Sequence, residues 1–102
     1  MYPVKEFEKR FREVLEALDE IRNDADDTEE LDELNAQFED ALFVIECIAP
    51  DEEEWREEFT DALDEFKDLC DGYRALENPA AAASADRLES LIRLAEANLP
   101  VE

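Results

Sequence analysis

Four segments of the chain repeat apolar residues at alternating steps of three and four, with short polar breaks between them. Such steps place the apolar residues on one side of an α-helix, because the helix turns once in about 3.6 residues. The pattern therefore predicts four amphipathic helices. Their expected ranges are about residues 4–23, 29–49, 51–77 and 79–98.

The breaks between the stripes carry residues that favour helix boundaries. Asp27 or Thr28 can cap the second helix, because a short polar side chain accepts a hydrogen bond from the first free backbone amides. Pro50 is expected to end the second helix or to open the third. Asn78 followed by Pro79 predicts an N-cap and the first residue of the fourth helix.

Four amphipathic helices with short connections are typical of an all-α, antiparallel four-helix bundle. The alternative is a three-helix core with a docked hairpin. The 102 residues suffice for a single domain, residues 1–102, with one core. Gly72 lies inside the third stripe and predicts a bend or frayed end there. A hairpin that turns near Pro50 would place Cys47 opposite about residue 53.

Charge is the strongest feature of the composition, with 32 acidic residues against 10 basic ones, no histidine and a net charge of −22. Residues 24–49 hold ten acids and no base, and residues 50–78 hold twelve acids and three bases. The segments 1–23 and 79–102 carry only −1 and −2. The second and third helices and their flanks thus hold −19 of the −22.

This charge excludes several classes of function. DNA, RNA and anionic membranes would repel the chain, so direct binding to them is not expected.

The longest apolar run, residues 41–45, is far shorter than the roughly 20 residues that span a bilayer, and the N-terminal stretch lacks the apolar core of a signal peptide. We therefore expect a cytoplasmic protein. Two cysteines are too few for a disulfide framework and predict free thiols.

The density of charge on the predicted hairpin suggests imitation of nucleic acid. The third helix would be about 40 Å long at about 1.5 Å per residue, so the hairpin would carry roughly one charge per 2 Å. Duplex DNA carries about one per 1.7 Å. The expected function is that of a small acidic binding protein that occupies a basic surface of a partner, in particular a nucleic-acid-binding protein. Inhibitors of the anti-restriction, anti-CRISPR and immunity types belong to this class.

Carboxylates of the second and third helices are the expected contacts with the partner's lysines and arginines, and one apolar residue joins them. The predicted partner-binding residues are Asp32, Glu33, Glu39, Asp40, Phe43, Glu54, Glu57, Glu58, Asp61, Asp64, Glu65 and Asp68. Phe43 is included because it points about 200° away from the stripe residues Ala41 and Ile45. It either forms an exposed apolar patch, for a partner or a homodimer, or is covered by another helix or by Tyr2.

A structural or oligomeric bundle is the alternative function, with acidity that serves solubility or salt adaptation. Three lysines against seven arginines agree with salt adaptation. Twenty Glu against twelve Asp, and the confinement of charge to one hairpin, agree with it less well. The alternatives are distinguished by whether particular acids are needed for binding.

Catalytic chemistry is not expected. Without histidine there is no Ser-His or Cys-His nucleophile pair and no typical zinc site, so we predict no catalytic residue, metal or cofactor. One motif resembles the paired E-x-x-E and E-x-x-D of all-α NTP pyrophosphohydrolases, which bind Mg²⁺: Glu30 and Glu33, followed by Glu58 and Asp61 or by Glu65 and Asp68. No basic cluster remains to hold a triphosphate, so this activity is a minor alternative.

Overall fold

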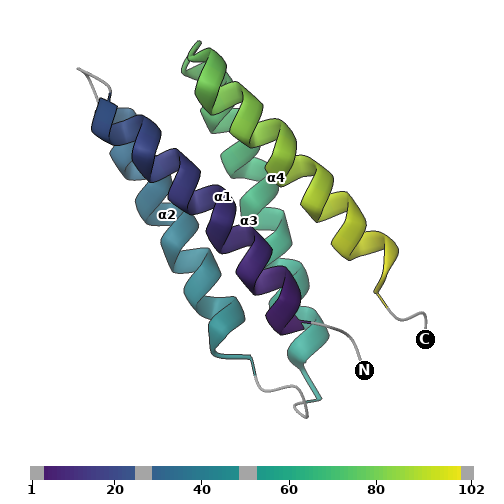
Figure 1. Cartoon of the computed structure of the whole chain (residues 1–102). Helices are drawn as coiled ribbons and strands as arrows, with labels where there is room; N and C mark the ends of the chain where they lie inside the picture. The colour runs from purple at the N-terminus through teal and green to yellow at the C-terminus, as the bar shows by residue number, and fades with distance from the viewer. Residues whose placement is uncertain (1–3, 25–28, 49–52, 100–102) are drawn as a thin grey trace.

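The computed structural model describes residues 4–24, 29–48 and 53–99 of the chain. These residues form four α-helices, which lie side by side in an elongated bundle of 46 × 22 × 18 Å (Figure 1). The helices are α1 (Val4–Asp24), α2 (Glu29–Glu46), α3 (Trp55–Ala75) and α4 (Pro79–Ala97). The prediction of an all-α helical bundle is confirmed.

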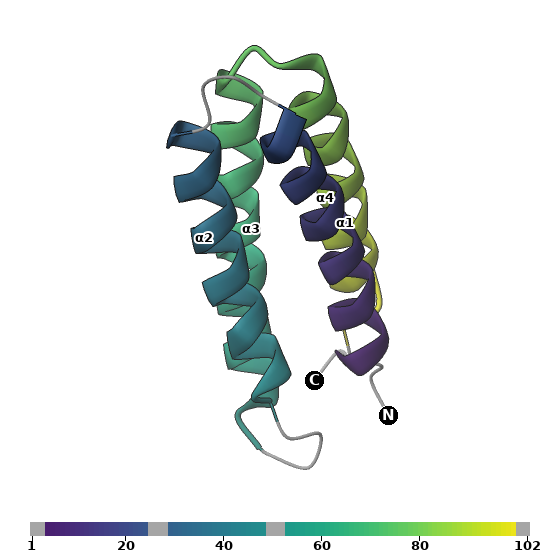
Figure 2. The same cartoon turned by 60° about the vertical axis from the view of Figure 1, so that its left-hand side comes forward.

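Each helix packs against its neighbours in the chain, and α1 closes the ring by packing against α4. Figure 2 shows the result as two layers, one formed by α2 and α3 and the other by α1 and α4. Successive helices run in opposite directions (Figure 1). The alternative with a three-helix core and a docked hairpin is not found, since all four helices contribute buried residues to one core.

The core forms where the apolar stripes of the helices meet. Phe66 of α3 lies at its centre, with ring centroids 4.7 Å from Phe11 of α1 and 5.0 Å from Phe38 of α2. On α4 the buried positions include the small residues Ala81 and Ala85. Small side chains allow close approach of a neighbouring helix, so the large rings of the other three helices can fill the interior.

The loop between α2 and α3 is longer than the sequence predicts. α2 ends at Glu46 rather than at residue 49, and α3 begins at Trp55 rather than at residue 51. Glu54 is the N-cap of α3, but its side chain makes no capping hydrogen bond. Ile48 is buried although it lies beyond α2, so burial alone does not extend the helix. The proposed cap Asp27 or Thr28 of α2, and Pro50, lie outside the described residues.

The boundary between α3 and α4 follows the prediction at α4. Asn78 Oδ1 accepts hydrogen bonds from the amides of Ala80 at 2.9 Å and Ala81 at 3.3 Å, with Pro79 as the first helical residue. α3 ends at Ala75, two residues before the expected 77. The reason is Glu77, which has a φ of 56°, a left-handed conformation that an α-helix cannot continue.

Gly72 does not end α3, which continues to Ala75. A Cβ atom on Gly72 would lie 2.7 Å from Cδ2 of Leu34 on α2. The absence of a side chain at Gly72 therefore lets Leu34 pack directly on the α3 backbone. The glycine brings α2 and α3 close together, which positions the surface described next.

Candidate partner-binding face

Basic residues of α1 compensate acids at the boundary between α1 and α2. The Arg12 guanidinium pairs with the Glu46 carboxylate, and Arg22 Nε lies 3.4 Å from Asp32 Oδ1. Lys5 Nζ also donates a hydrogen bond of 3.3 Å to the Glu46 carbonyl oxygen, at the end of α2. A cation at a helix C-terminus is favourable, because the carbonyl groups there carry partial negative charge.

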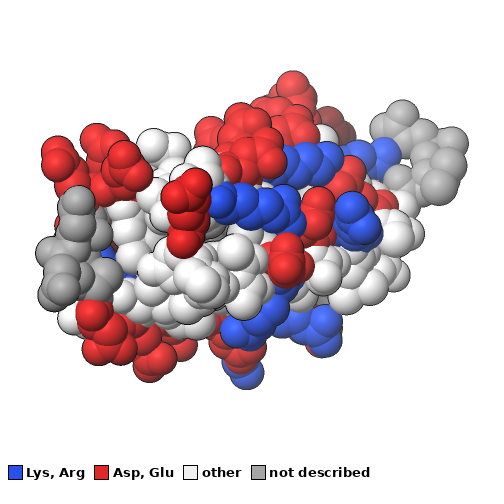
Figure 3. All heavy atoms as spheres, turned by 90° about the horizontal axis from the view of Figure 1, so that it is seen from above, with Lys and Arg blue, Asp and Glu red and all other residues white. Residues whose placement is uncertain are grey.

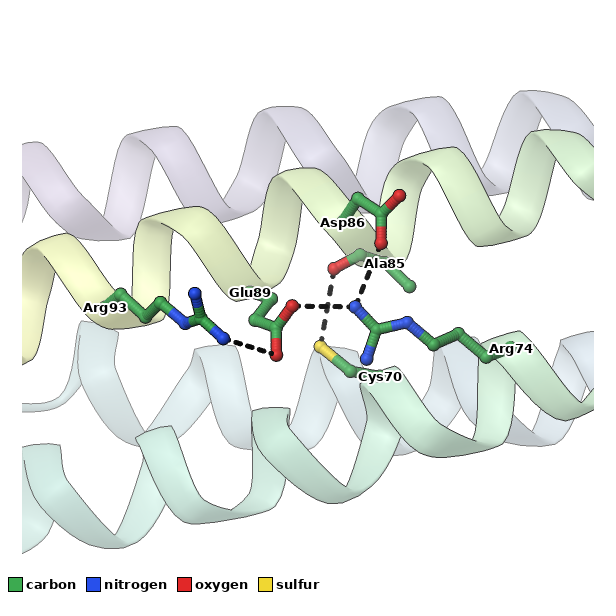
Figure 4. Close-up of polar contacts among 6 residues, drawn as sticks. All are labelled: Cys70, Arg74, Ala85, Asp86, Glu89 and Arg93. Atoms are coloured by element: carbon green, nitrogen blue, oxygen red, sulfur yellow. Dashed lines mark hydrogen bonds and ion pairs between the residues drawn. The ribbon is translucent and has the colours of Figure 1, made fainter.

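Basic residues of α3 compensate acids at the boundary between α3 and α4 in the same way. Arg74 Nη2 donates hydrogen bonds of 2.9 Å to both Asp86 and Glu89, and Arg93 binds the same Glu89 at 3.4 Å. Figure 4 shows the Arg74 side chain directed from α3 toward these carboxylates of α4. The hydrogen bond to Asp86, followed by that to Glu89, raises the pKa of Arg74 above its ordinary value.

Lys67 of α3 is also directed toward α4. Its Nζ lies 3.1 Å from Glu96 Oε2 of α4 and 3.7 Å from Asp64 Oδ1 of its own helix. Lys67 and Arg74 thus form their ion pairs on the side of α3 that faces α4. The acids on the side of α3 that faces α2 form no ion pair with Lys67 or Arg74.

A groove between α2 and α3 is lined by carboxylates without such compensation. It has a volume of about 290 Å³ and is lined by Gln37 and Asp40 of α2 and by Glu65, Asp68 and Leu69 of α3. Leu69, only 2% exposed, forms its apolar floor. Within the described part of the chain, none of the three carboxylates forms an ion pair with a lysine or arginine.

Steps of seven residues extend this groove along both helices, because they return to the same side of a helix. On α2, Glu33 lies seven residues before Asp40, and Val44 lies seven residues after Gln37. On α3, Glu58 and Asp61 lie seven residues before Glu65 and Asp68. We use the name α2–α3 groove for the surface formed by Glu33, Gln37, Asp40, Val44, Glu58, Asp61, Glu65, Asp68 and Leu69.

The other predicted acids lie outside the α2–α3 groove. Asp32 and Glu39 share a line of seven-residue steps with Glu46 and belong to the side of α2 that faces α1. Glu57 and Asp64 share the outer line of α3, and Asp64 is paired with Lys67. Glu54 precedes α3 as its N-cap and is one seven-residue step before Asp61.

Most of the predicted acids lack a cation in the described residues, although Asp32 and Asp64 have one. Like-charged side chains on neighbouring turns repel one another, so this surface is strained electrostatically in the free chain. The predicted acids for which the described residues provide no ion pair are Glu33, Glu39, Asp40, Glu54, Glu57, Glu58, Asp61, Glu65 and Asp68.

The charge density on the helices is lower than the sequence suggests. α2 carries seven acids and no base, and α3 carries seven acids and three bases, so together they hold −11. Over the about 32 Å of α3 this gives roughly one charge per 3 Å. The remaining −8 of residues 24–78 belongs to segments outside α2 and α3. The density is therefore close to the one charge per about 3.4 Å of a single nucleic-acid strand.

Exposed apolar residues lie at the C-terminal end of α2. Phe43 is 62% exposed and Val44 is 42% exposed, and Cys47 beyond them is also exposed. Val44 lies seven residues after Gln37, on the groove side of α2, whereas Phe43 lies four residues after Glu39 and three before Glu46, on their side of α2. Phe43 is left uncovered by the described helices. Tyr2, a candidate cover, lies outside the described residues.

The opposite layer has a different surface. Its groove, about 370 Å³ between α1 and α4, is lined by Arg10, Glu13, Arg87, Ser90 and Leu91. Figure 3 views the bundle from above relative to Figure 1, and basic side chains lie among acidic ones on that face. Unbalanced acidity is therefore a property of the α2–α3 layer and not of the whole molecular surface.

Three residues of the groove, Gln37, Val44 and Leu69, are not among those predicted from the sequence. Leu69 belongs to the core stripe, and only the packing of α2 against α3 makes it a groove floor. Gln37 and Val44 differ by one seven-residue step, and that spacing was available as a signal. Apart from Phe43, the predicted residues were selected by charge, and the neutral residues of the groove were therefore passed over.

Metal ligands and thiols are the other chemical groups that could form a site. The described residues contain no set of three Asp, Glu or Cys side chains arranged to hold a metal ion. Both cysteines are free thiols, with Cys47 exposed and Cys70 buried, where burial raises the pKa of Cys70 to about 11. Within the described part, no helix is long and apolar enough to cross a membrane.

The chain was compared with known proteins. No family model matches it, and neither a curated protein nor a solved structure matches it. Function must therefore be argued from the charge and shape of the α2–α3 layer itself.

Proposed function

We propose that the chain is a binding protein that uses the outer face of its α2–α3 layer to occupy a basic surface of a partner protein. The observation that carries this proposal is the distribution of ion pairs. Acids at the α1–α2 and α3–α4 boundaries have cations from a neighbouring helix, whereas Asp40, Glu65 and Asp68 at the α2–α3 boundary have none in the described residues.

The physical basis is the electrostatic gain when such a face meets lysines and arginines. Each carboxylate that meets a cation loses repulsion from its neighbours, and both surfaces release the ions that had condensed on them. Complementary charge also steers the encounter and raises the association rate at low salt. The binding should therefore weaken steeply as salt is added.

The partner site is proposed to be one that normally holds nucleic acid. A protein groove built for a phosphate backbone gains from carboxylates in a similar way, provided that their spacing is comparable. The roughly 3 Å per charge on α2 and α3 is near the value for a single strand. The chain would act as an inhibitor of the anti-restriction, anti-CRISPR or immunity type, without catalysis.

A structural or oligomeric role is the second candidate, and the exposure of Phe43 and Val44 favours it. A homodimer through Phe43 would bring together two copies of α2, each of which carries seven acids and no base. That repulsion opposes self-association at ordinary ionic strength. A basic partner can cover the same patch without this cost.

The experiment is a capture from nuclease-treated lysate of the source cells on the immobilised chain, followed by elution in steps of salt. The test variant carries Glu33→Gln, Glu57→Gln and Glu65→Gln on the α2–α3 layer. The matched control carries Glu13→Gln, Glu16→Gln and Glu20→Gln on α1, and both variants have the same net charge. We expect one basic protein that the wild type and the control retain, and that the test variant does not.

The captured protein should also be displaced by added DNA or RNA. Displacement would support competition for a nucleic-acid site. The proposal fails if the two variants retain the protein equally, if the protein stays bound at high salt, or if polynucleotide does not displace it. In each of these cases the acids serve solubility or salt adaptation, and the structural role becomes the better explanation.

A further inference from the structure

We propose that the α2–α3 groove receives a basic amphipathic α-helix of the partner, much as the major groove of DNA receives a recognition helix. This inference rests on the proposed function, because it specifies which element of a basic partner enters which part of the acidic face. It assigns the carboxylates as two rims and the apolar residues as the contact between them.

The two rims face each other across an apolar floor. Asp40 of α2 stands on one side, Glu65 and Asp68 of α3 stand on the other, and Leu69 lies between them. Packed helices have axes about 8–10 Å apart, and their flanking side chains project outward from there. The major groove of B-DNA is about 12 Å wide, is bordered by phosphates on both sides and admits one α-helix. The spacing of the charged rims is therefore suited to a helix.

The rims are long enough for several turns of an incoming helix. On α3 the rim runs from Glu58 to Asp68, which are ten residues and about 15 Å apart. On α2 the rim includes Glu33 and Asp40. About 15 Å corresponds to roughly three helical turns, so lysines or arginines at steps of three and four on both flanks of one helix would meet both rims.

The apolar residues explain why the occupant should be amphipathic. Leu69 lies at the floor of the groove, and Val44, which is 42% exposed, lies one seven-residue step after Gln37 toward the C-terminus of α2. An apolar stripe on the incoming helix would contact Val44 and the floor at Leu69, while its charged flanks reach the rims. Apolar contacts would add affinity to the attraction between charges, and the charges would also set orientation and rate. A flexible polycation would gain only from the charges.

The close approach of α2 and α3 preorganises this site. Gly72 allows Leu34 to pack on the α3 backbone, and the Tyr73 hydroxyl binds Asn35 of α2 at 2.7 Å. Both contacts hold the two helices together beside the groove. Rims that are fixed before binding lose little conformational freedom when a partner docks.

The test uses two synthetic peptides of about 18 residues, which is roughly five helical turns. One places leucines on a single helical stripe with lysines on both flanks, and the other has the same composition in a scrambled order. Binding is measured by fluorescence anisotropy at about 0.15 M salt, where the screening length is about 8 Å. We expect the wild type to bind the amphipathic peptide about tenfold more tightly than the scrambled one, a difference of the size that a few good contacts provide.

Two matched variants locate the contact. The groove variant is Asp40→Asn, Glu65→Gln and Asp68→Asn, and the control variant is Glu39→Gln, Glu57→Gln and Asp71→Asn. Each removes one carboxylate from α2 and two from α3, and all six side chains are exposed, so the fold should survive, as circular dichroism would verify. We expect the groove variant to lose about tenfold in affinity for the amphipathic peptide, consistent with three weak ion pairs, and the control to lose much less.

The outcomes separate the inference from the proposed function. If both peptides bind equally well, or if both variants lose affinity equally, the face binds cations without a helical site, and only the groove inference is overturned. If neither peptide binds to the wild type, the proposed basic-surface function fails together with the inference. Preference for the amphipathic peptide with selective loss in the groove variant supports both.

Discussion

The Tyr73 hydroxyl of α3 donates a hydrogen bond of 2.7 Å to Oδ1 of Asn35 on α2, and both residues are buried in the core. Asn35 Nδ2 in turn donates a 3.1 Å hydrogen bond to Asp19 Oδ1 on α1. Asn35, 4% exposed, occupies a core-facing position of α2 among apolar residues. A buried polar group requires partners, so this chain of hydrogen bonds favours one alignment of three helices over shifted ones.

We predict that Tyr73→Phe destabilises the fold by about 1–3 kcal/mol, because it leaves the Asn35 carbonyl oxygen buried without its donor. Urea unfolding followed by circular dichroism measures the loss. The double variant Asn35→Leu with Tyr73→Phe replaces both polar groups by apolar ones and should recover much of it. If Tyr73→Phe costs as much in the Asn35→Leu background as in the wild type, the hydrogen bond contributes nothing.

The stripes could be predicted from the sequence because the core of a bundle repeats with the helical period. The ends of α2 and α3 could not be predicted in this way. Residues 51–54 are four consecutive acids, which are favourable near a helix N-terminus, and this favours a start at residue 51. In the structure α3 begins at Trp55, which packs against the core and is followed four residues later by buried Phe59. Burial of apolar side chains, not the dipole, decides where α3 begins.

The longer loop also shifts the alignment of α2 against α3. Leu34 packs on Gly72, and thirteen residues further along α2 and thirteen back along α3 bring Cys47 opposite about residue 59. A tight turn near Pro50 would instead have placed Cys47 opposite residue 53. The length of a loop depends on what the flanking helices bury, and residue patterns within the loop do not determine it.

The candidate face could be predicted only in part, for a similar reason. The excess of acids on the second and third helices follows directly from the sequence. The sequence does not show which of these acids pair with cations, because the pairs Arg12–Glu46 and Arg74–Asp86 join residues from different helices. The α2–α3 groove appears only after these pairs are placed, since they compensate the flanks and leave its rims uncompensated.

A second prediction concerns alkaline pH. Burial is the largest cause that raises the pKa of Cys70 to about 11, from an ordinary value of 9.0. Between these values the unfolded chain loses the proton and the folded chain keeps it, so stability is complete below pH 9 and falls as pH rises toward 11. One such proton changes the free energy of unfolding by up to about 1.4 kcal/mol per pH unit.

Urea unfolding of the wild type and of Cys70→Ala between about pH 8 and pH 11 tests this prediction. We expect the variant to be less stable at neutral pH, because it loses buried volume, but to lose less further stability as pH rises. Cys47→Ala removes an exposed thiol and serves as the control, with the steeper wild-type decline retained. Parallel curves for wild type and Cys70→Ala would contradict the assignment.

Gly72→Ala tests the close approach of α2 and α3. Alanine favours a helix interior over glycine by about 1 kcal/mol, but its Cβ would lie 2.7 Å from Cδ2 of Leu34. The flexible end of the partly buried Leu34 must therefore rotate away, which offsets the gain. We expect a net change near zero in the wild type and a stabilisation of about 1 kcal/mol when Leu34→Ala is already present. The same effect in both backgrounds would mean that the contact costs nothing.

The Arg74 cluster at the α3–α4 boundary should depend on salt. Arg74→Met keeps an apolar stem but leaves Asp86 and Glu89 without this cation, so the variant should melt at a lower temperature than the wild type at low salt. The difference should shrink toward about 1 M salt, where the screening length is about 3 Å. Arg87→Met makes the same change of charge at an exposed position that has no ion pair within the described residues, and it should lower the melting temperature less. A difference that persists at high salt would assign the effect to packing.

The last prediction concerns the two aromatic residues of α2, one of which is buried and the other exposed. Phe38 lies at the centre of the core, 5.0 Å from the Phe66 ring, and Phe38→Ala should cost about 3–5 kcal/mol. Phe43 is 62% exposed, so Phe43→Ser should change the free energy of unfolding by less than about 0.5 kcal/mol.

The same Phe43→Ser variant should nevertheless weaken capture of the partner from lysate, because the exposed Phe43 ring lies three and four residues after Asp40 and Glu39, among the acids of α2. Urea unfolding provides the stability measurement, and the amount of partner retained at each salt step provides the binding measurement. Leu94→Ser, which alters an exposed apolar residue of α4 on the opposite layer, is the matched control and should leave capture unchanged. Equal capture by wild type, Phe43→Ser and Leu94→Ser would show that the partner binds through charge alone, and the apolar patch would then need another explanation.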